Sequence, residues 1–345
     1  MPQLDGLRAI SVLAVMYTHY LPKHYWFLSI YWGGYGVRIF FVISGFLVTQ
    51  ILLQKQRSGL RETNERWKIL KNFYIKRFLR LAPVFYLTLL VMFFFNVPNT
   101  RETFWWHVLY LSNINFAITN SYQEYVAHFW SLAVEFQFYL VWPFVILFLS
   151  EKALLVSILA TFPAVLVYRF LCLFLGVPYI ATWMLPPYSL DALMLGALLA
   201  FLSSYGKISS NDLWFKICAL IGIVIGAFGE YIFGPSKILM HMAPTLCSIF
   251  FSWIVLRAVE GTGGPSWQML QSKALTNIGK ISYGVYLFHF SLFYLLYPKL
   301  STLFPESNSW IDIGIAITIM LITLILAGIS WNYFEKPINQ YRRHF

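Results

Sequence analysis

Long apolar runs recur along this whole chain, and they limit the folds open to it more than any other feature. Hydrophobic residues make up 59% of the 345 residues and charged residues only 11%, whereas about a quarter of a soluble chain is charged. A helix needs roughly 20 mostly apolar residues to cross a bilayer. The sequence therefore predicts an all-α integral membrane protein with about ten transmembrane helices, at residues 7–22, 36–53, 80–96, 131–150, 153–175, 189–204, 217–233, 242–258, 281–299 and 311–331.

The basic residues indicate how these helices are oriented. The loop predicted at 54–80 is dense in Lys and Arg, and such loops lie on the cytoplasmic side of membrane proteins. An even number of spans then places both the N- and C-termini in the cytoplasm, in agreement with Lys336, Arg342 and Arg343. The same bias explains the net charge of +11 without nucleic acid. The segment 97–130, rich in Trp and Tyr, is predicted to lie along the outer membrane surface.

Ionisable residues inside a membrane are costly, so each one is a candidate for function. Arg8 and His19 lie eleven residues apart on the first predicted helix, which puts them on one face and roughly 16 Å apart along its axis. A cation at the cytoplasmic end and an imidazole at the outer end suit a path across the membrane. The alternative is that Arg8 reaches the interface and His19 is a packing residue.

Glu135 is the second candidate. It lies one turn from Ser131 and one turn from Tyr139 on a single predicted helix face, and His128 precedes that helix at its outer end. Glu135 can orient or balance the charge of His19, or it can be a structural carboxylate between helices.

Two further polar residues favour structural roles. Asp191 begins the helix predicted at 189–204, where a carboxylate is by default a cap or a partner of the helix dipole. His289 lies in the middle of a helix, where a polar contact between helices explains it.

Several kinds of site have no signature here. The sequence contains no G-x-S-x-G elbow and no HExxH zinc motif. Its three cysteines, Cys172, Cys218 and Cys247, all lie in apolar runs without the spacing of metal ligands. We therefore expect no metal and no disulfide framework.

Six segments, in order, resemble the acyltransferase-3 family of bacterial integral-membrane O-acyltransferases along nearly the whole chain. They are LDGLRAISVLAVMYTH at 4–19, GVRIFFVISGFLVT at 36–49, FYIKRFLRLAPVFY at 73–86, HFWSLAVEFQFYLVWP at 128–143, ISYGVYLFHF at 281–290 and YFEKP at 333–337. Two positions depart from the family pattern. Phe136 replaces a second Glu that often follows the residue matching Glu135, and Ser189 replaces an Arg that often precedes Asp191 by two positions.

The resemblance implies an enzyme that moves an acyl group, usually acetyl, from cytosolic acetyl-CoA to a hydroxyl of a carbohydrate or glycolipid acceptor at the outer face. It implies His19 as the catalytic base and Glu135 as the residue that orients it. Arg8, Arg77 and Arg80 would bind the phosphates of acetyl-CoA. Residues 1–345 are expected to form a single transmembrane acyltransferase domain in a bacterial cytoplasmic (inner) membrane, without the extracytoplasmic hydrolase-like domain of many relatives.

The main alternative is a proton-coupled transporter or flippase, in which the membrane-embedded Glu and His residues would relay protons. Transporters commonly contain internal repeats, and none is visible in this sequence. A non-catalytic membrane scaffold or sensor is a further alternative. The sequence leaves the acceptor, the length of the acyl group and the oligomeric state open.

Overall fold

The computed structural model of the chain describes residues 1–21, 32–58, 63–234, 236–261, 264–304 and 309–344, and these residues form helices and connecting loops without β-strands. The long helices are α1 (Pro2–Tyr20), α3 (Trp32–Arg57), α4 (Thr63–Phe94), α7 (Phe129–Phe148), α8 (Glu151–Phe174), α10 (Pro186–Ser203), α11 (Leu213–Phe233), α12 (Lys237–Glu260), α14 (Lys273–Ser301) and α15 (Ser309–Ser330). The predicted all-α class is therefore confirmed.

Eight helices in the described part of the chain are long and apolar enough to cross a membrane, which makes this a multi-pass membrane protein. Helices α1 and α14 are not among these eight. Helix α1 carries Asp5 and Arg8 in its first half, and α14 begins with the polar stretch that includes Lys273 and Lys280. The count of ten spans and the cytoplasmic position of both termini remain predictions.

Serine side chains fix the start of three long helices. The hydroxyls of Ser150, Ser236 and Ser272 each accept a hydrogen bond from the backbone N–H three residues further on, at the first turns of α8, α12 and α14. These bonds satisfy N–H groups that a helix leaves without a partner at its start. The polar residues between the apolar runs thus set the helix boundaries.

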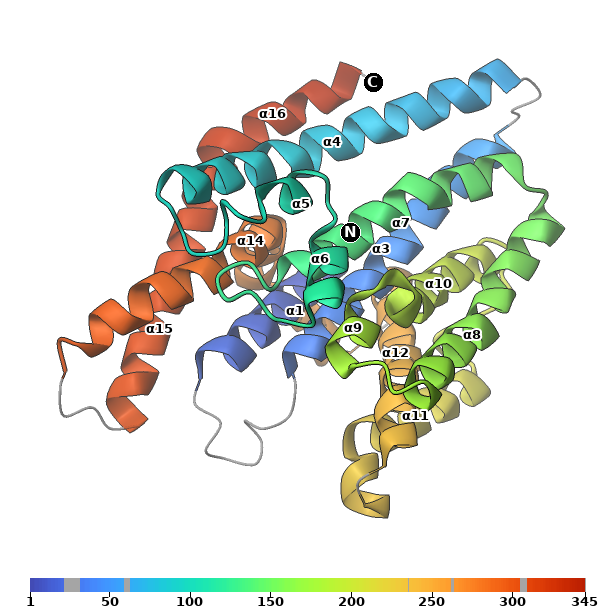
Figure 1. Cartoon of the computed structure of the whole chain (residues 1–345). Coiled ribbons are helices and arrows are strands. Elements are labelled where there is room, and N and C mark those ends of the chain that lie inside the picture. Colours follow the sequence, from blue (N-terminus) through green and yellow to red (C-terminus); the bar gives the residue numbers. More distant parts are fainter. Residues whose placement is uncertain (22–31, 59–62, 235, 262–263, 305–308, 345) are drawn as a thin grey trace.

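Helix α3 lies at the centre of the molecule, with α1, α7, α10 and α12 packed around it (Figure 1). Two glycines allow its close contact with α10. A Cβ atom at Gly45 would lie 1.9 Å from the carbonyl oxygen of Leu193, and one at Gly196 would lie 2.1 Å from the carbonyl oxygen of Val42. Small residues of this kind let membrane helices approach backbone to backbone.

The predicted loop at 54–80 needs correction. The region 54–80, predicted as a loop, is largely helical, because α3 continues to Arg57 and α4 begins at Thr63. The region 97–130 contains two short helices, α5 (Phe104–Val108) and α6 (Ser112–Thr119), and α6 packs on α7 through buried residues such as Asn113 and Phe116. Its position along the outer membrane surface stays a prediction.

The remaining short elements connect or end the long helices. They are α9 (Tyr179–Met184), α13 (Pro265–Met269), a π-helical turn η1 (Trp331–Glu335), α16 (Lys336–Gln340) and a 3₁₀ turn η2 (Tyr341–His344). The C-terminal elements α16 and η2 pack against α4 (Figure 1). This contact brings the basic end of the chain to the helix that carries Arg77 and Arg80.

Candidate functional site

The larger of two neighbouring cavities contains His19. Its volume is about 520 Å³, within the usual range for ligand sites. Besides His19, its wall includes His128 and a set of aromatic residues, Tyr122, Trp130, Tyr179, Trp183 and Tyr231, which come from α7, α9, α11 and the segment before α7. We call this space the histidine cavity. Its combination of apolar rings with a few polar groups is typical of a site for an organic ligand.

Three imidazole rings lie close together here, those of His19 and His128 in the cavity wall and that of His289 buried beside them. The ring centroids of His19 and His289 lie 5.5 Å apart, and those of His128 and His289 lie 5.0 Å apart. His19 also meets the ring of Phe290 edge to face at 4.5 Å. His289, which the sequence favours as a polar contact between helices, thus lies directly beside the predicted catalytic base.

Backbone carbonyls fix two of these rings. Nε2–H of His128 donates to the carbonyl of Leu287 at 2.9 Å, and Nδ1–H of His289 donates to the carbonyl of Tyr286 at 2.6 Å. The other nitrogen of each ring, Nδ1 of His128 and Nε2 of His289, is buried and has no hydrogen-bond partner among the described residues. Such nitrogens in a dry interior are costly unless a donor reaches them, which marks this group as a place where a ligand or water can bind.

The smaller cavity brings together four residues that the sequence singles out. Its volume is about 70 Å³, and its wall includes Arg8 of α1, Arg77 and Arg80 of α4, and Glu135 of α7. We call it the arginine cavity. The three predicted donor-binding cations therefore face one space, although they lie on two helices that are far apart in the sequence.

Glu135 has its own partners in the arginine cavity. Its Oε1 accepts hydrogen bonds from the hydroxyl of Ser44 and from that of Tyr139, the latter at 2.5 Å. Glu135 and His19 line different cavities. Glu135 thus lies next to the cations, and its predicted role in orienting His19 stays a prediction.

Positive charge is in excess around the arginine cavity. Arg8 forms an ion pair with Asp5 at 3.1 Å, but within the described residues Arg77, Arg80 and Arg342 form none. Arg77 lies over the ring of Tyr139, 4.9 Å from its centroid. Arg342 of η2 is close enough for its charge to act on that of Arg80. Neighbouring cations in a poorly solvated space repel one another, so an anionic group is the natural occupant.

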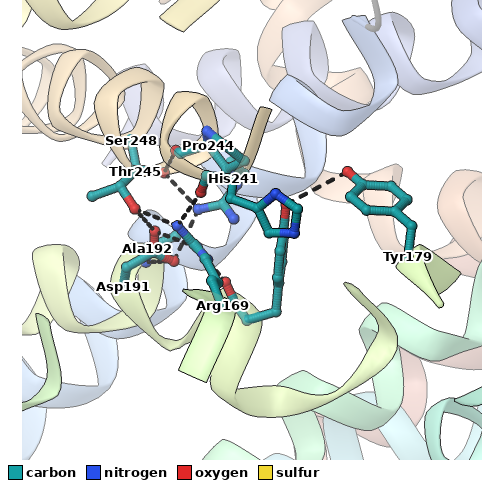
Figure 2. A network of polar contacts seen from close by, with 10 residues as sticks. Arg169, Tyr179, Asp191, Ala192, His241, Pro244, Thr245 and Ser248 are labelled. Atoms are coloured by element: carbon teal, nitrogen blue, oxygen red, sulfur yellow. Dashed lines mark hydrogen bonds and ion pairs between the residues drawn. The ribbon is translucent and has the colours of Figure 1, made fainter. Parts of the chain in front are cut away.

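A buried ion-pair network adjoins the histidine cavity through Arg38, which lines it. Figure 2 shows this network from close by. Asp191 of α10 pairs with Arg38 of α3 at 2.9 Å and with Arg169 of α8 at 2.8 Å. On α12, Thr245 accepts a hydrogen bond from Arg169 at 2.7 Å, and Ser248 accepts one from Arg38 at 3.0 Å. The network joins four helices, and Arg38 itself lines the histidine cavity.

This network corrects the interpretation of Asp191 as a helix cap. Helix α10 begins at Pro186, which places Asp191 beyond the first turn, and its carboxylate is fully buried between two guanidinium groups. Arg38 and Arg169 supply the positive charge around Asp191, whereas Ser189, two residues before it, carries none. Sequence analysis overlooked Arg38 because its partner is 153 residues away along the chain.

Comparison with known proteins identifies the class. A family model described as an acyltransferase domain matches residues 1–331, and the protein therefore belongs to the acyltransferase family that its motifs resemble. The chain is similar to the peptidoglycan O-acetyltransferase OatA of Listeria monocytogenes, with 27% identity over 98% of this chain and 56% of that protein.

Other relatives give the same picture. The putative peptidoglycan O-acetyltransferase YrhL of Bacillus subtilis is 26% identical over 98% of the chain and 54% of its own length. The O-acetyltransferase OatA of Staphylococcus aureus is 26% identical over 99% of the chain and 57% of its own length. The chain thus spans a little over half the length of these relatives. No solved structure matches it.

Proposed function

We propose that the protein is a membrane O-acetyltransferase that moves an acetyl group from acetyl-CoA to a hydroxyl of a carbohydrate or glycolipid. The observation that carries this proposal is the pair of adjoining cavities, one lined by three arginines and the other by His19. The arginine cavity suits a polyanionic donor, and the histidine cavity suits an acceptor with many hydroxyl groups. The names of two relatives suggest peptidoglycan as the acceptor.

The arginine cavity is the proposed donor end, facing the cytoplasm of a bacterial cell at its inner membrane. Guanidinium groups form strong, charge-assisted hydrogen bonds with phosphate. In this proposal the phosphates of acetyl-CoA stay at the rim of the cavity, where they relieve the repulsion among Arg8, Arg77 and Arg80, and only the thioester end enters the space of about 70 Å³. Glu135 holds the hydroxyls of Ser44 and Tyr139 beside them, and we propose that this carboxylate limits how deep the anionic phosphates enter.

The histidine cavity is the proposed acceptor end. Aromatic rings present broad apolar faces, on which the C–H faces of sugar rings stack, while the imidazoles offer hydrogen bonds to sugar hydroxyls. His19 accepts the proton of the attacking hydroxyl as its oxygen adds to the thioester carbonyl. The carbon–sulfur bond then breaks, the thiolate of CoA takes the proton from His19, and an ester and free CoA are formed.

The test is acetyl-CoA turnover by the purified protein in lipid nanodiscs, with a soluble peptidoglycan fragment as acceptor. We expect release of CoA thiol and an added acetyl mass on the fragment, both dependent on His19. Release of neither product would contradict the proposal. Movement of a solute across vesicles without consumption of acetyl-CoA would instead support the transporter alternative.

A further inference from the structure

Three side chains of the described residues line both cavities: Val37, Phe41 and Tyr286. Val37 and Phe41 lie one turn apart on the same face of α3, and Tyr286 faces them from α14. Together they form the wall between the arginine cavity and the histidine cavity. Any acyl group that is carried on a donor in the first cavity and received by an acceptor in the second must pass this wall.

The wall is held in place by its surroundings. Phe41 is 2% exposed and meets the ring of Trp130 edge to face, with 6.1 Å between centroids. The hydroxyl of Tyr286 donates to the hydroxyl oxygen of Ser131 at 2.6 Å, and that hydroxyl in turn donates to the carbonyl of His128 at 3.0 Å. Side chains packed and hydrogen-bonded in this way do not move aside at little cost.

The space on the donor side of the wall is small. A single water needs roughly 10–15 Å³ of cavity volume. The cavity of about 70 Å³ therefore holds on the order of five water-sized groups. This is enough for a thioester with a two-carbon acyl group, and each added methylene must displace part of the wall.

We infer that Val37, Phe41 and Tyr286 determine the length of the acyl group and restrict the enzyme to acetyl. The inference rests on the proposed acyltransferase function and adds the residues that would set the length of the transferred acyl group. The wall acts by size, because Val37 and Phe41 carry no group that reacts or titrates.

The test measures kcat/KM for acetyl-CoA and butyryl-CoA on the same preparation of each variant. The ratio of the two values does not depend on how much protein has folded, which protects the measurement from losses on substitution. One methylene in an apolar site changes specificity by about 10–200-fold, so the wild-type protein should prefer acetyl by at least about 100-fold.

Val37→Ala and Phe41→Leu should each lower this preference by about 10-fold or more, because each opens the wall by at least one methylene. Val42→Ala is the matched control: it removes the same two methyl groups from a buried position of α3 that lines neither cavity, and it should keep the wild-type ratio.

The possible results separate the inference from the function on which it rests. If the wild-type protein consumes acetyl-CoA but both wall variants keep its preference, the wall does not set acyl length and the inference is overturned. The same holds if Val42→Ala relaxes the preference as much as Val37→Ala does. If the wild-type protein releases CoA from neither donor, the proposed function itself fails.

Discussion

At the scale of single residues, the carboxylate of Asp191 between two arginines is the contact on which the stability of the fold depends most clearly. A buried charge is tolerable only when it is paired and hydrogen-bonded, and Asp191 meets this condition through Arg38, Arg169 and Thr245. Removing it would leave two buried cations facing each other without compensation. The network therefore has a structural role that can be tested apart from catalysis.

Asp191→Ala should destabilise the protein by about 3–5 kcal/mol, the usual cost of breaking a buried ion pair from one side. Glu151→Ala is the control, because Glu151 pairs with Arg57 at 3.0 Å on the exposed surface and such pairs contribute roughly 0–1 kcal/mol. Thermal unfolding in detergent, followed by tryptophan fluorescence, compares the two. Equal, small losses of stability would show that the network is not important for the fold.

His107 of α5 is a buried histidine outside the membrane-spanning helices. Its Nε2–H donates to the hydroxyl oxygen of Thr103 at 2.9 Å, and the hydroxyl of Ser112 donates to its Nδ1 at 2.7 Å. Burial lowers the pKa of His107 from its usual 6.5 to about 4. The folded protein therefore holds this imidazole in its neutral form near pH 7.

Stability should therefore fall as the pH falls from about 6.5 towards 4, since the unfolded chain takes up a proton on this residue before the folded chain does. The contribution is fully present above pH 6.5, and about 3 kcal/mol of stability is lost once both states are protonated, below about pH 4. The loss of melting temperature between about pH 7.5 and about pH 5 should be smaller in His107→Gln than in the wild-type protein. An equal loss in both would assign the acid sensitivity to other groups.

At the scale of elements, α4 shows what the sequence can and cannot predict. The predicted helices 131–150 and 153–175 agree closely with α7 (Phe129–Phe148) and α8 (Glu151–Phe174), because their apolar runs coincide with the helices. Helix α4 starts seventeen residues before the predicted 80–96 helix, since its first half is rich in Lys and Arg. Such residues favour helix as strongly as Leu does, but they hide it from a search for apolar runs.

The C-terminal elements add a cation that sequence analysis assigned only to topology. Arg342 is half-buried against α4, where its charge acts on those of Lys76 and Arg80, and its Nε is buried without a hydrogen-bond partner. The neighbouring Arg343 is exposed. The two residues therefore offer the same charge in different positions.

We expect Arg342→Gln to weaken binding of acetyl-CoA by about 10-fold, the loss of one charge-assisted contact with phosphate. Arg343→Gln removes the same charge from the next residue and should leave the affinity unchanged. Equilibrium binding in nanodiscs at several salt concentrations measures both, and the salt dependence should be weaker for Arg342→Gln. Equal affinities for the two variants would show that Arg342 does not contact the donor and serves only to orient the protein in the membrane.

At the scale of the whole molecule, the site could be predicted in its parts but not in its arrangement. Arg8 and Glu135 follow from the cost of charge in a membrane and Arg77 and Arg80 from the family resemblance, and the structure does bring these four together. The separation of Glu135 from His19 does not follow from it, because that depends on how α7 is placed against α1 and α3. Pairings between distant helices leave no local trace in the sequence.

The predicted orientation places the arginine cavity towards the cytoplasm, and this can be tested directly. In a variant without the three native cysteines, Ser58→Cys and Glu124→Cys should react with a membrane-impermeant thiol reagent from opposite sides of the membrane. Both positions are exposed. Modification of both from the same side of intact cells would contradict the predicted topology.

The most direct test of the account compares acetyl-CoA binding with acetyl transfer in His19→Ala and Arg80→Ala, at matched expression and melting temperature. His19→Ala should bind acetyl-CoA as the wild-type protein does but transfer acetyl roughly 10²–10⁴-fold more slowly, because the base is lost while the donor end is intact. Arg80→Ala should bind the donor weakly. Transfer at the wild-type rate by a well-folded His19→Ala protein would contradict the division of the site into a donor cavity and a catalytic cavity.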